Sequence, residues 1–139
     1  MDFLFDCFED DIWERLDRRT RESDLPGGVY HVHLLKAGFP PLREHFQPVP
    51  RLLKPDPMGR LYIGKASDFR DRLITLRKSL LPSHRTDTHG FARAALRLFP
   101  AEQLALSVEF HADPTSAERQ ALRDYRDEFG ELPPFNAIG

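Results

Sequence analysis

Four side chains of this sequence have the chemistry that hydrolysis of a phosphodiester bond requires: Tyr30, Tyr62, Arg72 and Glu118. The reaction needs a base that takes a proton from water, positive charge around the phosphorus, and stabilisation of the leaving oxygen. Glu118 is a hard oxygen ligand suited to one Mg²⁺ or Mn²⁺, and a metal held by a single carboxylate keeps several waters and binds substrate phosphate oxygens. Arg72 can bind a phosphate through two parallel hydrogen bonds. A tyrosine is protonated at neutral pH unless a nearby cation or metal lowers its pKa from about 10.

Each of these residues also has a purely structural interpretation. Tyrosine is common in half-buried strands, so both tyrosines can simply belong to a sheet. Glu118 follows Thr115 by three residues, which is the spacing of a capping box at the start of a helix. Arg72 can pair with Asp68, one helical turn earlier. Together these alternatives predict a folded domain without a site.

Three strands are predicted around the two tyrosines. The first covers residues 29–35, and the second covers residues 60–65, with Leu61 and Ile63 on one side and the tyrosine on the other. The third, residues 104–111, alternates strictly between apolar and other residues. The two tyrosines share a face only if the first two strands pair in an antiparallel register that brings them close together.

The first strand also carries two histidines on the face opposite its tyrosine. His31 and His33 could in principle bind zinc with His84, His89 or His111, but the spacing typical of a structural zinc site is not present. Zinc is therefore a minor alternative.

Helices are predicted between and after these strands. One is expected to start with Ser67 as its cap and to end before Pro82, and a second covers about residues 88–98. A third starts within residues 113–118, with proline in its first turn and a capping box from Thr115 to Glu118, and ends near Phe129. The sequence therefore predicts an α+β fold, a small three-stranded antiparallel sheet flanked by helices.

Two further segments complete the predicted organisation. Residues 1–25 contain apolar side chains at steps of three and four, Phe5 and Ile12 among them, and predict an accessory amphipathic helix. Residues 26–139 form the main domain, which is interrupted at residues 36–59 by a proline-rich insertion read as a long loop.

The motifs together resemble the GIY-YIG nuclease family. Gly28-Val29-Tyr30 is followed by Tyr62-Ile63-Gly64, and the stretch from Tyr62 to Leu73, which includes Arg72, is similar to the strand-to-helix signature of the family throughout its length. Glu118 matches the acidic helix of the family, and Asn136 matches the asparagine that commonly closes the domain. The sequence departs from the family in its long spacing between the tyrosines and in Leu76, where many members carry His or Tyr.

The resemblance implies a role for each matching residue. Tyr30 would act as the general base on water, Tyr62 would orient water or phosphate, and Arg72 would bind the phosphate. Glu118 would hold Mg²⁺, and Asn136 would support the site by hydrogen bonding. Four basic residues of the same region are predicted to bind the substrate: Lys65, Arg70, Arg77 and Lys78.

The charge distribution is compatible with a nucleic-acid partner. The chain of 139 residues has a net charge of -2, but residues 60–97 hold nine basic and three acidic residues, whereas both ends are acidic. The positive block could face a phosphate backbone, or it could pair with the acidic ends. DNA is favoured over RNA as the partner, and both a monomer and a homodimer are possible.

Composition limits the setting of the protein. The longest stretch without a charged residue is 11 residues, Leu25 to Leu35, which is too short for a membrane span of roughly 20. The first residues are acidic, unlike a targeting peptide, and the single cysteine, Cys7, predicts a reducing, cytoplasmic location.

Two functions from different classes follow. The first is a metal-dependent endonuclease, a hydrolase that cuts nucleic acid, most often DNA. The second is a binding module for nucleic acid or protein that keeps the fold and has lost catalysis.

Overall fold

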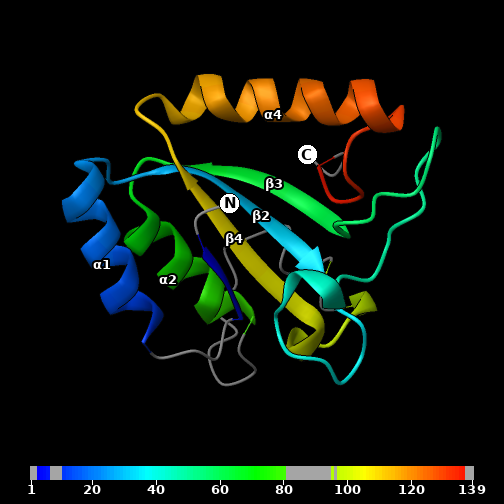
Figure 1. The fold of residues 1–139 in the computed structure, drawn as a ribbon, viewed down its shortest axis with the longest axis horizontal. Coiled ribbons are helices and arrows are strands. Elements are labelled where there is room, and N and C mark those ends of the chain that lie inside the picture. The colour runs from blue at the N-terminus through cyan, green and yellow to red at the C-terminus, as the bar shows by residue number, and fades with distance from the viewer. Residues whose placement is uncertain (1–2, 7–10, 81–94, 96, 137–139) are drawn as a thin grey trace.

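A four-stranded antiparallel sheet forms the centre of the protein (Figure 1). The computed structural model describes residues 3–6, 11–80, 95 and 97–136. The strands lie in the order β1-β4-β2-β3. Their bounds are β1 Phe3–Asp6, β2 Gly28–Leu34, β3 Arg60–Ala66 and β4 Leu104–Phe110.

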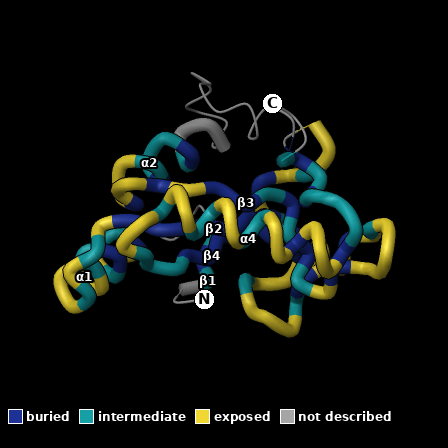
Figure 2. The backbone as a smooth tube through the Cα atoms, turned by 90° about the horizontal axis from the view of Figure 1, so that it is seen from above, coloured by how far each residue is buried: buried dark blue, intermediate teal, exposed yellow. Residues whose placement is uncertain are grey.

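Helices cover both faces of the sheet (Figure 1). Helices α1 (Ile12–Ser23) and α2 (Phe69–Leu80) lie on one face, and α4 (Pro114–Phe129) lies on the other. The larger apolar core lies on the α1 and α2 side and includes Tyr30 and Val32, while a smaller cluster packs Val29 and Ile63 beneath α4. The strands are buried and the outer faces of the helices are exposed, as Figure 2 shows.

The predicted α+β class is confirmed, but the sheet has four strands and not three. Strands β2, β3 and β4 lie where the sequence predicted them. The additional strand is β1, which pairs with β4 and places Phe5 opposite Leu106 in the main core. The sequence assigned Phe5 to the amphipathic helix, which in fact starts at Ile12. The segment is so short that the two-residue apolar spacing of a strand cannot be distinguished from the three- to four-residue spacing of a helix.

A β-bulge corrects the predicted faces of β3. Val32 pairs with Tyr62, but the next pair joins His33 to Arg60, so Leu61 is the extra residue. Because a bulge adds one residue to one strand, it reverses the alternation of side chains at that point. Leu61 therefore lies in the main core, whereas Ile63 lies beneath α4, and the prediction that they share a side is wrong.

The capping residues of two helices also differ from the prediction. Asp68, and not Ser67, caps α2, because its Oδ1 accepts the N–H of Asp71 at 3.2 Å. Helix α4 begins at Pro114 with Asp113 as its cap, which accepts the N–H of Ser116 at 3.1 Å. The predicted capping box from Thr115 is therefore wrong. At both helix starts the sequence has two possible capping residues close together, so sequence alone does not decide between them. In α4, proline at the first helical position fixes where the helix begins.

The proline-rich segment 36–59 runs as a loop from β2 to β3, as predicted, with one 3₁₀ turn at Arg43–His45. It reaches the C-terminal end of α4, where the N–H of Leu53 donates to the carbonyl of Phe129 at 3.0 Å. In Figure 1 this loop and the start of α4 lie at opposite ends of the sheet. Most of the helix predicted for residues 88–98 lies outside the described residues. No described helix is long and apolar enough to cross a membrane.

Candidate active site

Antiparallel pairing of β2 and β3 brings the two tyrosines together, as the sequence predicted. Tyr30 lies opposite Gly64, and Tyr62 lies opposite Val32, so the tyrosines are diagonal neighbours on one face. Their ring centroids are 6.0 Å apart. A Cβ atom on Gly64 would lie 2.5 Å from Cζ of Tyr30, so glycine is required at this position for the Tyr30 ring to lie across the strand.

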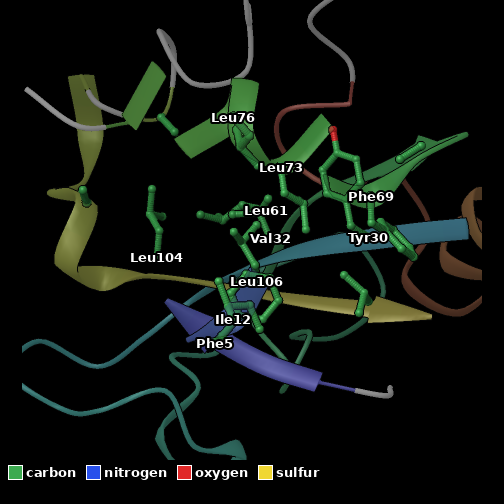
Figure 3. Packing of buried hydrophobic residues seen from close by; sticks show 14 of the residues in the cluster. Phe5, Ile12, Tyr30, Val32, Leu61, Phe69, Leu73, Leu76, Leu104 and Leu106 are labelled. Atoms are coloured by element: carbon green, nitrogen blue, oxygen red, sulfur yellow. The ribbon is translucent and has the colours of Figure 1, made fainter. Parts of the chain in front are cut away.

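Tyr30 is fully buried, whereas Tyr62 is partly exposed. Figure 3 shows the Tyr30 ring at the margin of the core, with its hydroxyl directed away from Phe5 and Leu106. The burial of a hydroxyl is unfavourable unless the group is hydrogen-bonded. That of Tyr30 interacts with both Arg72 and Tyr62.

The surroundings act on the two phenols to different extents. Burial is the largest influence on both and raises both pKa values, while the positive charge of Arg72 lowers both. Tyr30 is the more deeply buried and its pKa is raised strongly, whereas the pKa of Tyr62 is raised less. Of the two phenols, the partly exposed Tyr62 therefore loses its proton more readily.

Glu118, on α4, acts electrostatically on the same group. Its negative charge raises the pKa of Tyr62, which places the carboxylate within electrostatic range of that phenol. Because α4 starts at Pro114, Glu118 lies more than one turn inside the helix and is not part of its N-terminal cap. The structural interpretation of Glu118 as a capping residue therefore does not hold.

A cleft of about 480 Å³ lies beside this group, between the N-terminal ends of α2 and α4. Arg72 belongs both to the cleft wall and to the tyrosine group. Lys65 and Thr115 line the opposite side, where Lys65 Nζ donates to Thr115 Oγ1 at 3.2 Å. The sequence identified Thr115 only as a cap, because no local pattern indicates its contact with a residue 50 positions away.

Asn136 lies behind the site and contacts the backbone of β3. Its Oδ1 accepts the N–H of Ile63 at 2.9 Å, and its Nδ2 donates to the carbonyl of Ile63 at 2.8 Å. Both bonds are made at the outer edge of the sheet, next to Tyr62. Asn136 thus fixes the strand that carries a site tyrosine.

The four residues predicted to bind substrate are placed differently. Lys65 lines the cleft. Arg70 forms an ion pair with Asp17 of α1, and the guanidinium of Arg77 lies 5.8 Å from the ring centre of Trp13, also in α1. The side chain of Lys78 lies outside the described residues. Of the three cations whose side chains the structure describes, only Lys65 lines the cleft.

This site can hold a metal ion only if water and substrate complete the coordination of the ion. Glu118 supplies a hard oxygen donor, and the described residues contain no cluster of three or more histidine, cysteine or acidic side chains that could enclose an ion. This donor set suits Mg²⁺ or Mn²⁺ held partly by water and substrate, and it does not suit a structural zinc site. Leu76, at the position where the resembled family often carries His or Tyr, is fully buried in the core.

Comparison with known proteins adds no further assignment. No protein-family model matches the sequence, and no curated protein or solved structure matches it. The resemblance to GIY-YIG nucleases therefore stays a prediction carried by the motifs.

Proposed function

We propose that this protein is a metal-dependent endonuclease that hydrolyses phosphodiester bonds in nucleic acid, with DNA as the favoured substrate. The observation that supports the proposal is the contact of Tyr30 with Tyr62 and Arg72 beside one open cleft, together with the electrostatic effect of Glu118 on Tyr62. These residues come from two strands and two helices on different sides of the sheet, and the stability of a sheet does not require them to lie close together.

The roles follow from burial, hydrogen bonding and charge. The resemblance assigns the base to Tyr30, but the full burial of Tyr30 favours the partly exposed Tyr62 as the phenol that takes the proton from water. Tyr30 then stabilises the Tyr62 phenolate, and Arg72 binds the phosphate and stabilises its added charge. Glu118 would hold Mg²⁺, which supplies positive charge at the phosphate and the leaving oxygen.

The proposal is tested with supercoiled plasmid, single-stranded DNA and RNA, each with Mg²⁺ or Mn²⁺ and with EDTA. We expect DNA cleavage that EDTA abolishes and that Glu118→Ala slows by about 100-fold or more, because removal of one charge-stabilising group has effects of this size. Glu102→Ala is the matched control, since Glu102 is an exposed carboxylate in the 3₁₀ turn Ala101–Gln103, away from the cleft. Equal cleavage by the Glu118→Ala protein, or no cleavage of any substrate, would falsify the proposal.

The second candidate is a binding module of the same fold without catalysis. The burial of Leu76 in the core favours it, because that position offers no group to assist the base. It predicts binding of nucleic acid that weakens with salt, without product. Cleavage that depends on both Tyr62 and Glu118 would exclude it.

A further inference from the structure

A second cleft, of about 280 Å³, lies on the face of the sheet opposite the tyrosine pair. This volume is at the lower end of the range for small-molecule sites, about 300–1,000 Å³. Neighbouring strands supply the floor, and the proline-rich loop supplies part of the wall. The cleft is lined by His31, Arg43, Met58, Arg60, Ser107 and Glu109.

Ser107 offers this cleft a hydrogen-bond acceptor. The carbonyl oxygen of Met58 can only accept, so His33 Nδ1, at 2.8 Å, carries the proton. Burial lowers the pKa of His33 to about 3, so the imidazole is neutral and its Nε2 accepts the Ser107 hydroxyl at 2.7 Å. The proton of Ser107 is thus used, and its oxygen presents lone pairs.

Glu109 adds a second acceptor on the same strand. It follows Ser107 by two residues in β4, so both side chains lie on one face of the sheet. Its carboxylate is partly exposed and lies 3.4 Å from His111 Nε2 at the edge of the cleft. The β4 side of the cleft therefore presents acceptor oxygens.

The opposite side presents donors. Arg60 in β3 is held by buried Asp56, to which its Nε donates at 3.0 Å and its Nη2 at 3.3 Å, so Nη1 is the nitrogen that does not contact Asp56. Its guanidinium lies 4.9 Å from the ring centre of Tyr125. Arg43 is exposed and comes from the 3₁₀ turn of the loop. Because β2 separates β4 from β3, the acceptor and donor sides are about two strand spacings, roughly 10 Å, apart.

His31 lies between these two sides. It is only 9% exposed, and its Nδ1 has no hydrogen-bond partner among the described residues. Burial, aided by the charge of Arg60, lowers the pKa of His31 to about 4, so the ring is neutral and has one donor and one acceptor. Buried polar atoms nearly always have a partner, so this nitrogen is evidence for a polar ligand in the cleft.

We propose that this cleft binds a guanine base. Guanine has acceptors O6 and N7 on one edge, which guanidinium groups bind in pairs, and N–H donors at N1 and N2 on the adjacent edge. Arg43 and Arg60 match the first edge, and Ser107 and Glu109 match the second. Adenine and cytosine have a ring nitrogen acceptor beside their amino group, and the Glu109 carboxylate would repel that acceptor.

The base can belong to a free nucleoside or to a nucleic-acid strand, since both present the same edges. The proposal does not depend on hydrolysis at the tyrosine site. It gives the loop of residues 36–59 a role in recognition, through Arg43 and Met58.

The test is isothermal titration of the full chain with 2′-deoxyguanosine, which carries no phosphate. We expect binding at least about tenfold tighter than that of deoxyadenosine or deoxycytidine, and weaker binding of deoxyinosine, which lacks only the N2 amine. Glu109→Gln and Arg43→Ala should each weaken binding about tenfold or more. Their matched controls, Glu102→Gln and Arg97→Ala, change exposed residues outside the cleft and should bind as the parent does. Circular dichroism checks that each variant is folded.

Three results would overturn the proposal: no binding of deoxyguanosine, equal binding of all nucleosides, or an unchanged guanine preference in folded Glu109→Gln. A thymidine oligonucleotide with one guanine, compared with one without, distinguishes the sources. Preference for the guanine strand indicates reading of nucleic acid, and binding of the nucleoside alone indicates a free ligand. Glu118→Gln should bind deoxyguanosine like the parent, which separates this test from that of the nuclease.

Discussion

At the scale of single residues, burial decides which groups carry charge. His31 and His33 are nearly or fully buried on the α4 side of the sheet, where Arg60 and Asp56 act on both rings and Arg43 and Glu109 line the cleft beside His31. Burial disfavours the imidazolium form, and Arg60 repels it more than Asp56 attracts it. Both rings therefore stay neutral in the folded protein at pH values where an exposed histidine is protonated.

The first prediction concerns the stability of the protein in mild acid. Unfolded histidine binds a proton near pH 6.5, whereas folded His31 and His33 do so only near pH 4 and 3. Between these values the unfolded state binds more protons, so stability is fully present above pH 6.5 and falls as the pH decreases. Urea unfolding at pH 7 and pH 4.5 should show a loss of a few kcal/mol.

Two variants show which histidine causes this loss of stability. His31→Gln should remove about 2 kcal/mol of the difference between the two pH values, because the linked proton is gone. His45→Gln, which changes the histidine of the 3₁₀ turn of the loop, should keep the full difference. A parent protein equally stable at both pH values would show that the two rings already bind protons when folded.

At the scale of elements, the C-terminal segment completes the sheet. The N–H of Phe135 donates to the carbonyl of Leu61 at 2.9 Å, and Asn136 makes its two bonds to Ile63, so the outer edge of β3 is paired with chain instead of water. An edge strand without such cover has unpaired backbone groups and frays. The position of Tyr62 therefore depends on residues more than 70 positions later.

Asn136→Ala tests this dependence. Loss of the side chain leaves the N–H and C=O of Ile63 without their partners, which costs about 1–3 kcal/mol. Amide hydrogen exchange should be faster at Ile63, while Val32, between β3 and β4, should change only with global stability. Asn136→Asp keeps an acceptor for the Ile63 N–H but cannot donate to the Ile63 carbonyl, so it should restore only part of the protection. Unchanged exchange at Ile63 would mean that the strand edge holds its position without Asn136.

Sequence reasoning reached most elements but not their local exceptions. Alternation and composition predicted β2, β3, β4 and α4, because each is long enough for its period to be visible. It could not find β1, which has four residues, or the bulge at Leu61, which depends on how two strands pair. It selected the four site residues by their match to the motifs of the family that the sequence resembles. Their burial, which separates the roles of Tyr30 and Tyr62, follows from packing across the whole core.

At the scale of the whole molecule, contacts within the protein already hold several basic side chains of the positive block that the composition suggests. Arg60 is bound to Asp56, Arg70 to Asp17, and Arg77 lies over Trp13. Lys65 and Arg72 remain at the cleft. Among the described residues, the surface for a phosphate backbone at this site is therefore small, which limits how strongly salt should affect binding.

The last prediction is the salt dependence of DNA binding. Each neutralised phosphate contributes about -0.9 to the slope of log K against log salt concentration, so two to four contacts give a slope of roughly -2 to -4. Fluorescence anisotropy of a labelled duplex with the Glu118→Gln protein, in EDTA and at several salt concentrations, measures this slope without cleavage. Lys65→Ala should reduce its magnitude by about one, because a phosphate contact is lost. Arg70→Ala should leave it unchanged, since Arg70 is held against α1. If both substitutions reduce the slope equally, the DNA lies across α1 and α2 and the cleft is not its principal contact.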